Sequence, residues 1–210
     1  MGSTTSVRII NMALSKLGAK RITTTSDDTV SARAAVAVYT EILDEVLMEH
    51  AWSFAQKRVA LAELGTDPVW EDDGMTVAYG IPTDMLKLNY TNMPSAIVRV
   101  EAVGILSDTS SLEILYTYRA TDTTKYSTMF VTALATRLAA EMAFGLTNSK
   151  TAMEYLMKEY EDIRLPRAIQ CDSQMGSPVG AIADEWLSSR ISGSSGQITG
   201  RTGDSTWYPI

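Results

Sequence analysis

The chain has 210 residues, long enough for one domain or for one domain with a long appendage. Its hydrophobic content of 45% supplies a packed core and argues against disorder throughout. Because 25 acidic residues face 18 basic ones, the net charge is -7. A sequence-independent nucleic-acid binder needs the opposite balance against phosphate, so we do not expect that class of protein.

Compartment and membrane signals are sparse. The single cysteine, Cys171, cannot form an internal disulfide, so a reducing compartment is expected. No apolar run reaches the roughly 20 residues that span a bilayer, and the N-terminus does not resemble a secretory signal. Met1, Gly2 and Ser6 fit the loose myristoylation pattern, but nothing nearby supports membrane attachment.

Two helices are predicted in the first 50 residues. The first covers residues 6–18, with Gly18 as a left-handed C-terminal cap and an apolar face of Val7, Ile10, Leu14 and Leu17. The second is capped by Asp27 or Asp28 and reaches about His50. Its apolar stripe is Ala35, Tyr39, Ile42 and Val46.

The opposite side of the second helix is acidic, with Glu41, Asp44, Glu45 and Glu49. We interpret it as a solvated face, because charged side chains are mostly exposed. The alternative is a contact with a basic patch on a neighbouring subunit.

The middle third is predicted to form a small, mainly antiparallel sheet. Helical periodicity gives way near Trp52 to a strand-like segment at residues 54–61, and a corner at residues 81–84 leads into a strand at 85–88. Residues 97–106 and 112–118 are predicted to pair as a hairpin across the turn at residues 107–110. In the second of these strands one face carries Leu112, Ile114, Tyr116 and Tyr118.

Helical periodicity returns after Thr121 and Asp122, a plausible N-terminal cap. A ladder of Phe130, Leu134, Leu138 and Met142 lies beside many alanines, which allow a neighbouring helix to approach closely. We expect Gly145 and residues 147–148 to break this helix, and Pro166 to end or kink the next one. The inward residues of that last helix would be Met153, Leu156, Met157, Tyr160 and Ile163.

From about Asp172 the composition changes to Gly, Ser, Thr and Pro. We therefore divide the chain into a core, residues 1–171, and an extended C-terminal docking arm, residues 172–210. Such an arm buries too little surface to offset its own ordering entropy and would gain order by docking on other subunits. The alternative is a tail that folds back on its own domain. The candidate interface residues of this arm are Val179, Ile182, Trp186, Leu187, Arg190, Trp207 and Tyr208.

No catalytic, cofactor or metal site is predicted. His50 is the only histidine, and no nucleophile motif lies near it in the sequence, so we interpret it as a structural partner. One Cys and one His exclude the usual structural zinc set. The glycine-rich segment near Gly200 lacks the first glycine and the lysine of a phosphate-binding loop. Asp84 is interpreted as a turn residue that bonds its own backbone.

Two short motifs carry a resemblance to a known family. The first consists of Trp52, Phe54, Ala55, Lys57, Arg58 and Leu61, and the second of Pro82, Asp84 and Leu86. In their order and spacing they resemble the tail tubular protein A-like head-to-tail adaptors of tailed bacteriophages. The later helices, from Asp122 through Phe130 to Leu146 and Thr147, are also similar to that family. The resemblance covers roughly residues 7–190.

The resemblance implies an α+β fold, with a four-helix bundle packed on the small sheet. It implies a structural virion protein with no enzymatic activity or cofactor, assembled in the cytoplasm of the host bacterium. Such a protein forms a dodecameric ring in the virion neck, between the portal protein and the downstream tail tube or nozzle protein. DNA would pass through the channel without specific binding, because an acidic channel wall would not hold its phosphates. No membrane would be involved. The alternatives are another neck ring, such as a head-completion or stopper protein, or a small hydrolase.

Overall fold

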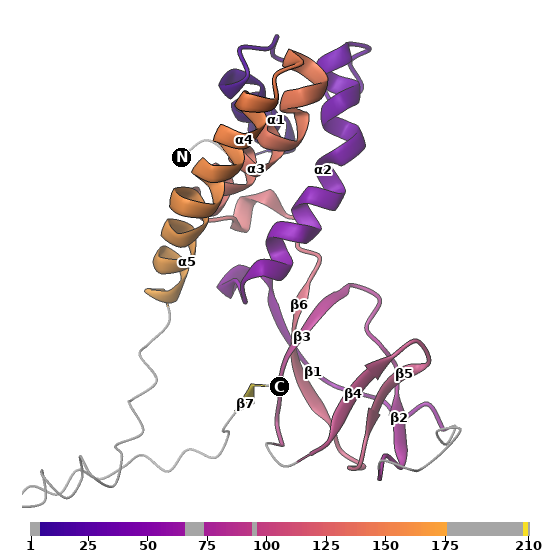
Figure 1. The fold of residues 1–210 in the computed structure, drawn as a ribbon. Coiled ribbons are helices and arrows are strands. Elements are labelled where there is room, and N and C mark those ends of the chain that lie inside the picture. Colours follow the sequence, from indigo (N-terminus) through magenta and orange to yellow (C-terminus); the bar gives the residue numbers. More distant parts are fainter. Residues whose placement is uncertain (1–4, 66–73, 94–95, 176–207, 210) are drawn as a thin grey trace, which may run out of the picture.

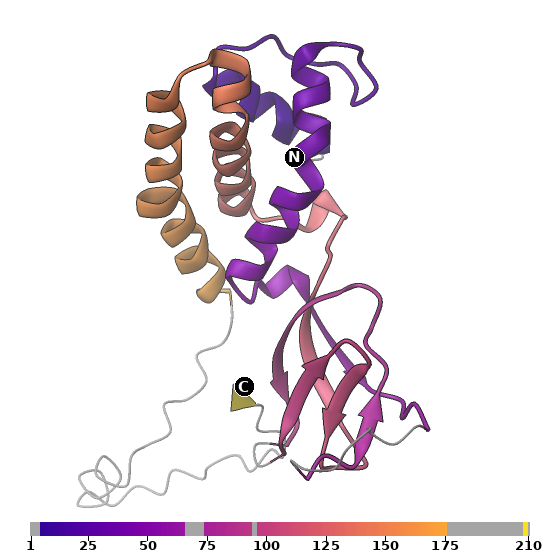
Figure 2. The same ribbon diagram turned by 45° about the vertical axis from the view of Figure 1, so that its right-hand side comes forward.

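A computed structural model describes residues 5–65, 74–93, 96–175 and 208–209. The elements form two units, which lie end to end in Figures 1 and 2. Helices α1 to α5 make up the helical unit, and the strands make up the β unit. The chain enters the β unit after α2 and returns to the helices after β6. The protein is therefore of mixed helix and antiparallel-sheet class, as predicted.

Helix α1 (Ser6–Lys16) matches the prediction, and Gly18 follows its end with a φ of 66°. Helix α2 (Val30–Glu49) is capped by Thr29, so the prediction of a cap at Asp27 or Asp28 was wrong. The Asp27 carboxylate instead accepts hydrogen bonds from the hydroxyls and backbone N–H groups of Thr24 and Thr23, and these bonds hold its pKa well below the usual value. The polar link before α2 is thus closed by a local turn.

Helix α3 (Thr128–Thr147) is the central helix of the core. Its predicted ladder is buried, with Phe130, Leu134 and Leu138 fully enclosed. Asp122 caps only the short turn η2 (Thr123–Lys125), and Ser127 caps α3 itself. Gly145 does not break the helix, which ends at Asn148 in a left-handed conformation. Helix α3 is long and apolar enough to cross a membrane, but 67% of that window is buried inside the protein, as expected of a core helix.

The last helix contains a π-helical turn. Helices α4 (Lys150–Glu159) and α5 (Leu165–Ser173) are joined without a break by η3 (Tyr160–Arg164). Pro166, which has no N–H to donate, lies just after this turn, so the helix continues where an end or a kink was predicted. The wider turn changes the helical phase, and Ile163, predicted to point inward, is 43% exposed.

The acidic side of α2 is only partly solvated. Asp44 accepts hydrogen bonds from Arg119 at 2.9 and 2.5 Å, and Glu45 accepts two from Arg137. Glu49 accepts one from the Tyr160 hydroxyl at 2.5 Å. These three side chains therefore bind partners in their own chain. Glu41 and Glu49 are nevertheless exposed and the Glu45 side chain is 43% exposed, so the interpretation as a solvated face fails mainly at Asp44, whose side chain is 14% exposed.

The β unit consists of two small sheets where one was predicted. The first has the order β1-β6-β3-β7, from Gln56–Ala60, Glu113–Tyr118, Met85–Thr91 and Tyr208–Pro209. The second has the order β2-β5-β4, from Val77–Tyr79, Gly104–Ser107 and Val98–Glu101. The predicted hairpin was wrong, because the turn lies inside residues 97–106, between β4 and β5, while β6 pairs with β1 and β3.

The apolar face predicted for β6 explains this arrangement. Leu112, Ile114 and Tyr116 pack against Tyr79 and Ile105 of the other sheet, so they form a core between the two sheets. A Cβ at position 104 would lie 2.4 Å from the Tyr79 carbonyl oxygen, so only glycine lets β5 approach β2 this closely.

An aromatic cluster fills the joint between the two units. Trp52 follows α2, is fully buried, and donates its indole N–H to the Val46 carbonyl at 2.8 Å. Its ring meets that of Phe130 edge-on at 4.9 Å, and the Phe54 ring lies 4.9 Å from the same Phe130. Phe54 lies in the short 3-10 turn η1 (Ser53–Ala55), which leads into β1, and it packs against the helical core.

Candidate interaction site

Most of the predicted contact residues of the arm lie outside the described residues. These are Val179, Ile182, Trp186, Leu187, Arg190 and Trp207. Of Tyr208 the backbone is described, as part of β7. The division into a core and an arm, and the role of these side chains, stay predictions.

The base of the predicted arm is anchored by Asp172. This residue lies in α5, and its side chain is 3% exposed. Its carboxylate accepts hydrogen bonds from the Ser53 backbone N–H at 2.9 Å and from the Ser53 hydroxyl at 2.7 Å. His50 Nε2 lies 3.5 Å from the same carboxylate. The helical core therefore extends to Ser173, just beyond the predicted boundary, and α5 is tied to the joint after α2.

Ser, His and Asp thus come together in a way that the sequence did not reveal, because Asp172 is far from the other two along the chain. In a nucleophilic triad the histidine lies between the serine and the aspartate, where it takes the serine proton. Here Asp172 lies between Ser53 and His50, and the Ser53 hydroxyl donates to the carboxylate. This geometry suits an anchor, with His50 as the structural partner that the sequence suggested.

The two family-like motifs meet at the start of β3. Lys57 of the first motif forms an ion pair with Asp84 of the second, and its ammonium lies 4.0 Å from the centre of the Tyr118 ring. The Tyr116 hydroxyl donates to the other oxygen of Asp84 at 3.0 Å. The hydrogen bond from Lys57 holds the pKa of Asp84 below its usual value, while burial and Asp84 raise the pKa of Tyr116 to about 12.

Asp84 therefore does more than bond its own backbone, which was the interpretation from the sequence. It links β1, β6 and the corner that leads into β3. Nearby, the Arg119 backbone N–H donates to the Asp84 carbonyl at 2.8 Å, and the Arg119 guanidinium holds Asp44 of α2. Through Arg119, the corner at Asp84 is thus connected to α2 of the helical unit.

The outer edge of β3 accepts an extended segment. One side of β3 pairs with β6, and on the other side Tyr90 pairs with Pro209 and Thr91 with Tyr208. The rest of that outer edge, from Met85 to Asn89, pairs with no strand among the described residues. A free strand edge offers backbone N–H and C=O groups to any extended chain that can lie along it.

No model of a known protein family and no curated protein matches this chain.

Proposed function

We propose that this protein is a head-to-tail adaptor of a tailed bacteriophage, a structural component that forms a ring between the portal and the tail. The observation that carries the proposal is the strand β7, which returns from beyond α5 to occupy the outer edge of β3. The chain thus combines a short C-terminal strand with a strand edge that accepts it. An assembly protein needs both, because its contacts must reach from one subunit to the next.

The two family-like motifs support the same proposal. In this chain they meet at the joint, where Lys57 pairs with Asp84, and Trp52 and Phe54 pack in the helical core. A joint of this kind fixes the angle between the helical unit and the β unit. A ring closes only when every subunit contact repeats the same rotation, so a fixed angle favours closure. The proposal includes the family arrangement of a four-helix bundle seated on a sheet, and a ring of twelve copies.

The mechanism is multivalent docking. Each arm would make a weak contact with the portal, and ring closure would make the later contacts effectively intramolecular, which raises the total avidity by a factor of roughly 10² to 10⁴. The partners are other copies of the chain, the portal protein and the downstream tail tube or nozzle protein, and the site of action is the virion neck. DNA would pass through the channel without specific binding, as the net charge of -7 favours.

The arm is tested by deletion. Because Asp172 anchors α5 to Ser53, the cut belongs after Met175 and not at the predicted boundary. The shortened chain, residues 1–175, should keep its helical circular dichroism and lose binding to purified portal in a sedimentation assay. Equal portal binding by the shortened and the full chain would refute docking through the arm. Stable binding to a tail-tip or fibre protein would instead favour a different position for this protein in the virion.

A further inference from the structure

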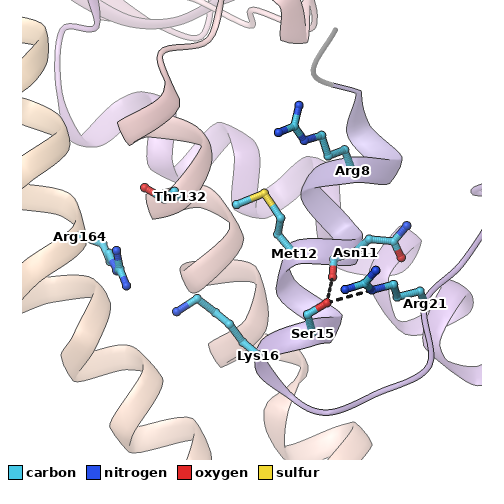
Figure 3. A pocket seen from close by; sticks show the side chains of 8 residues that line it. All are labelled: Arg8, Asn11, Met12, Ser15, Lys16, Arg21, Thr132 and Arg164. Carbon is cyan, nitrogen blue, oxygen red and sulfur yellow. Dashed lines mark hydrogen bonds between the residues drawn. The ribbon is translucent and has the colours of Figure 1, made fainter. Parts of the chain in front are cut away.

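A basic groove lies on the helical unit (Figure 3). It has a volume of about 510 Å³, and its polar rim includes four cationic side chains, Arg8, Lys16, Arg21 and Arg164. They come from α1, from the loop that follows it, and from the π-helical turn η3. No carboxylate is among the described residues that line it. This concentration of positive charge stands out in a chain whose net charge is -7.

The groove already binds one carboxylate at its margin. Lys16 Nζ lies 3.0 Å from both oxygens of Glu159, and the Arg164 guanidinium donates to the same carboxylate at 2.7 Å. Burial alone would raise the pKa of Glu159, but these hydrogen bonds lower it below its usual value. Two cations thus share one anion. Arg21 donates through Nε to the Ser15 hydroxyl at 3.3 Å, a bond that leaves its charge uncompensated by any carboxylate in the described ion pairs.

The chemistry of the groove favours an acidic peptide over nucleic acid. Guanidinium groups bind carboxylates through several N–H donors, and Arg164 contacts the Glu159 carboxylate through two of its nitrogens. The Met12 side chain projects between the cations and offers apolar contact to the stems of peptide side chains (Figure 3). Binding along DNA needs a long basic surface that neutralises many phosphates, whereas this groove is one open depression on an acidic protein.

The chain itself contains a matching segment. Residues 66–73 read TDPVWEDD, and Glu71, Asp72 and Asp73 form the longest uninterrupted acidic run of the sequence. The segment joins Gly65 to Gly74, which lead from β1 to β2 in the β unit. A segment this short, fixed at both ends, reaches about 15 Å at most. Figure 1 shows β2 in the lower part of the β unit and α1 in the helical unit, so this segment is attached in one unit and the groove lies in the other. This placement favours a contact between two copies.

We propose that the basic groove binds the acidic segment 66–73 of a neighbouring copy. The contact is heterologous, because one surface of the first copy meets a different surface of the second, and such contacts form closed rings when the rotation between subunits completes a circle. The proposal rests on the proposed ring and names the contact between its subunits. It concerns self-association alone, so its failure would leave docking to the portal untouched.

A peptide tests the groove directly. A fluorescein-labelled peptide of residues 66–74 should bind the full chain in a fluorescence-anisotropy titration. A matched peptide with Glu71→Gln, Asp72→Asn and Asp73→Asn should bind at least tenfold more weakly. The Arg21→Glu protein should also bind the natural peptide at least tenfold more weakly, whereas Lys158→Glu, an equal charge change on the exposed side of α4, should leave binding unchanged. Equal binding of both peptides, or tighter binding of a labelled DNA duplex, would overturn the proposal.

Charge exchange tests the same contact between whole chains. Self-association measured by sedimentation velocity should fall at least fivefold in Arg21→Glu and in Asp72→Arg, and the double variant should recover most of it. Recovery requires that the two positions meet, because two unrelated surface defects would add. A double variant that associates as weakly as the single variants would rule out this pairing.

Discussion

The joint between the helices and the β unit depends on Trp52, and we predict that Trp52→Ala lowers the free energy of unfolding by about 3–5 kcal/mol. The side chain is fully buried and contacts the rings of Phe130, Phe54 and His50. Truncation to alanine therefore removes a large apolar surface from the core and leaves a cavity. It also removes the donor to the Val46 carbonyl at the end of α2.

Two matched variants separate these contributions. Trp52→Phe keeps an aromatic ring in the joint but leaves the Val46 carbonyl without its indole donor, so we expect a loss of about 1–3 kcal/mol. Tyr155→Ala removes an aromatic ring that is 70% exposed on α4, and its effect should stay within about 0.5 kcal/mol.

Equilibrium urea unfolding followed by far-ultraviolet circular dichroism measures all three variants. Fluorescence is unsuitable, because Trp52 is the only one of the four tryptophans within the described residues and is the side chain removed. A loss below about 1 kcal/mol for Trp52→Ala would refute the reasoning. Trp52 would then be exposed in solution and better explained as part of an interface.

Three further predictions concern charged side chains. Asp172→Ala should lower the free energy of unfolding by about 2 kcal/mol, since it removes the buried carboxylate that accepts from both the Ser53 N–H and the Ser53 hydroxyl. An unchanged urea midpoint would mean that α5 is not anchored there. The pKa of Glu159 is lowered in the fold, so its contribution to stability is present above the ordinary value of 4.5 and is lost as the pH falls through the folded pKa. Glu159→Gln should therefore show a smaller drop in urea midpoint between pH 6 and pH 3.5 than the unmodified chain, and an equal drop would contradict this assignment. Arg137→Leu should lower the free energy of unfolding by less than about 1.5 kcal/mol, because its two partner carboxylates are 43% and 46% exposed and keep their hydration. A loss above about 3 kcal/mol, measured by thermal unfolding, would contradict this expectation.

The helices were predictable where one periodicity holds throughout. The ladder of Phe130, Leu134, Leu138 and Met142 repeats every four residues, and the structure buries all of it. The same reasoning failed at Ile163, because it assumed an unbroken α-helical period. The π-helical turn at Tyr160–Arg164 changes the phase, and no residue in the sequence signals it except Pro166.

The strands were harder to assign, since their pairing depends on contacts between distant segments. Apolar residues run through 97–106 with Gly104 among them, and the sequence offered no reason to place a turn before that glycine. Gly104 is needed there because β5 passes close to the Tyr79 backbone, and this contact forms only when β2 pairs with β5. The sheet-facing residues Ile114 and Tyr116 were nevertheless identified correctly from their alternation.

The contacts between the motifs were also beyond local reasoning. Asp84 was interpreted as a turn residue because aspartate favours turns, whereas in the fold Lys57 and Tyr116 reach it from two other strands. Likewise, Asp172 looked like the start of a polar arm, because the composition changes there. The Asp172 carboxylate reaches Ser53 only because α5 packs against the joint.

Mass photometry of the purified chain with purified portal protein tests the central claim most directly. The claim predicts that the mixture contains one discrete complex whose mass equals the portal ring plus a full ring of this chain, while residues 1–175 alone add nothing to the portal. Negative-stain images of the complex should show an added ring on one end of the portal. A mixture in which the portal mass stays unchanged, at concentrations where the chain is folded, would contradict the assignment as an adaptor.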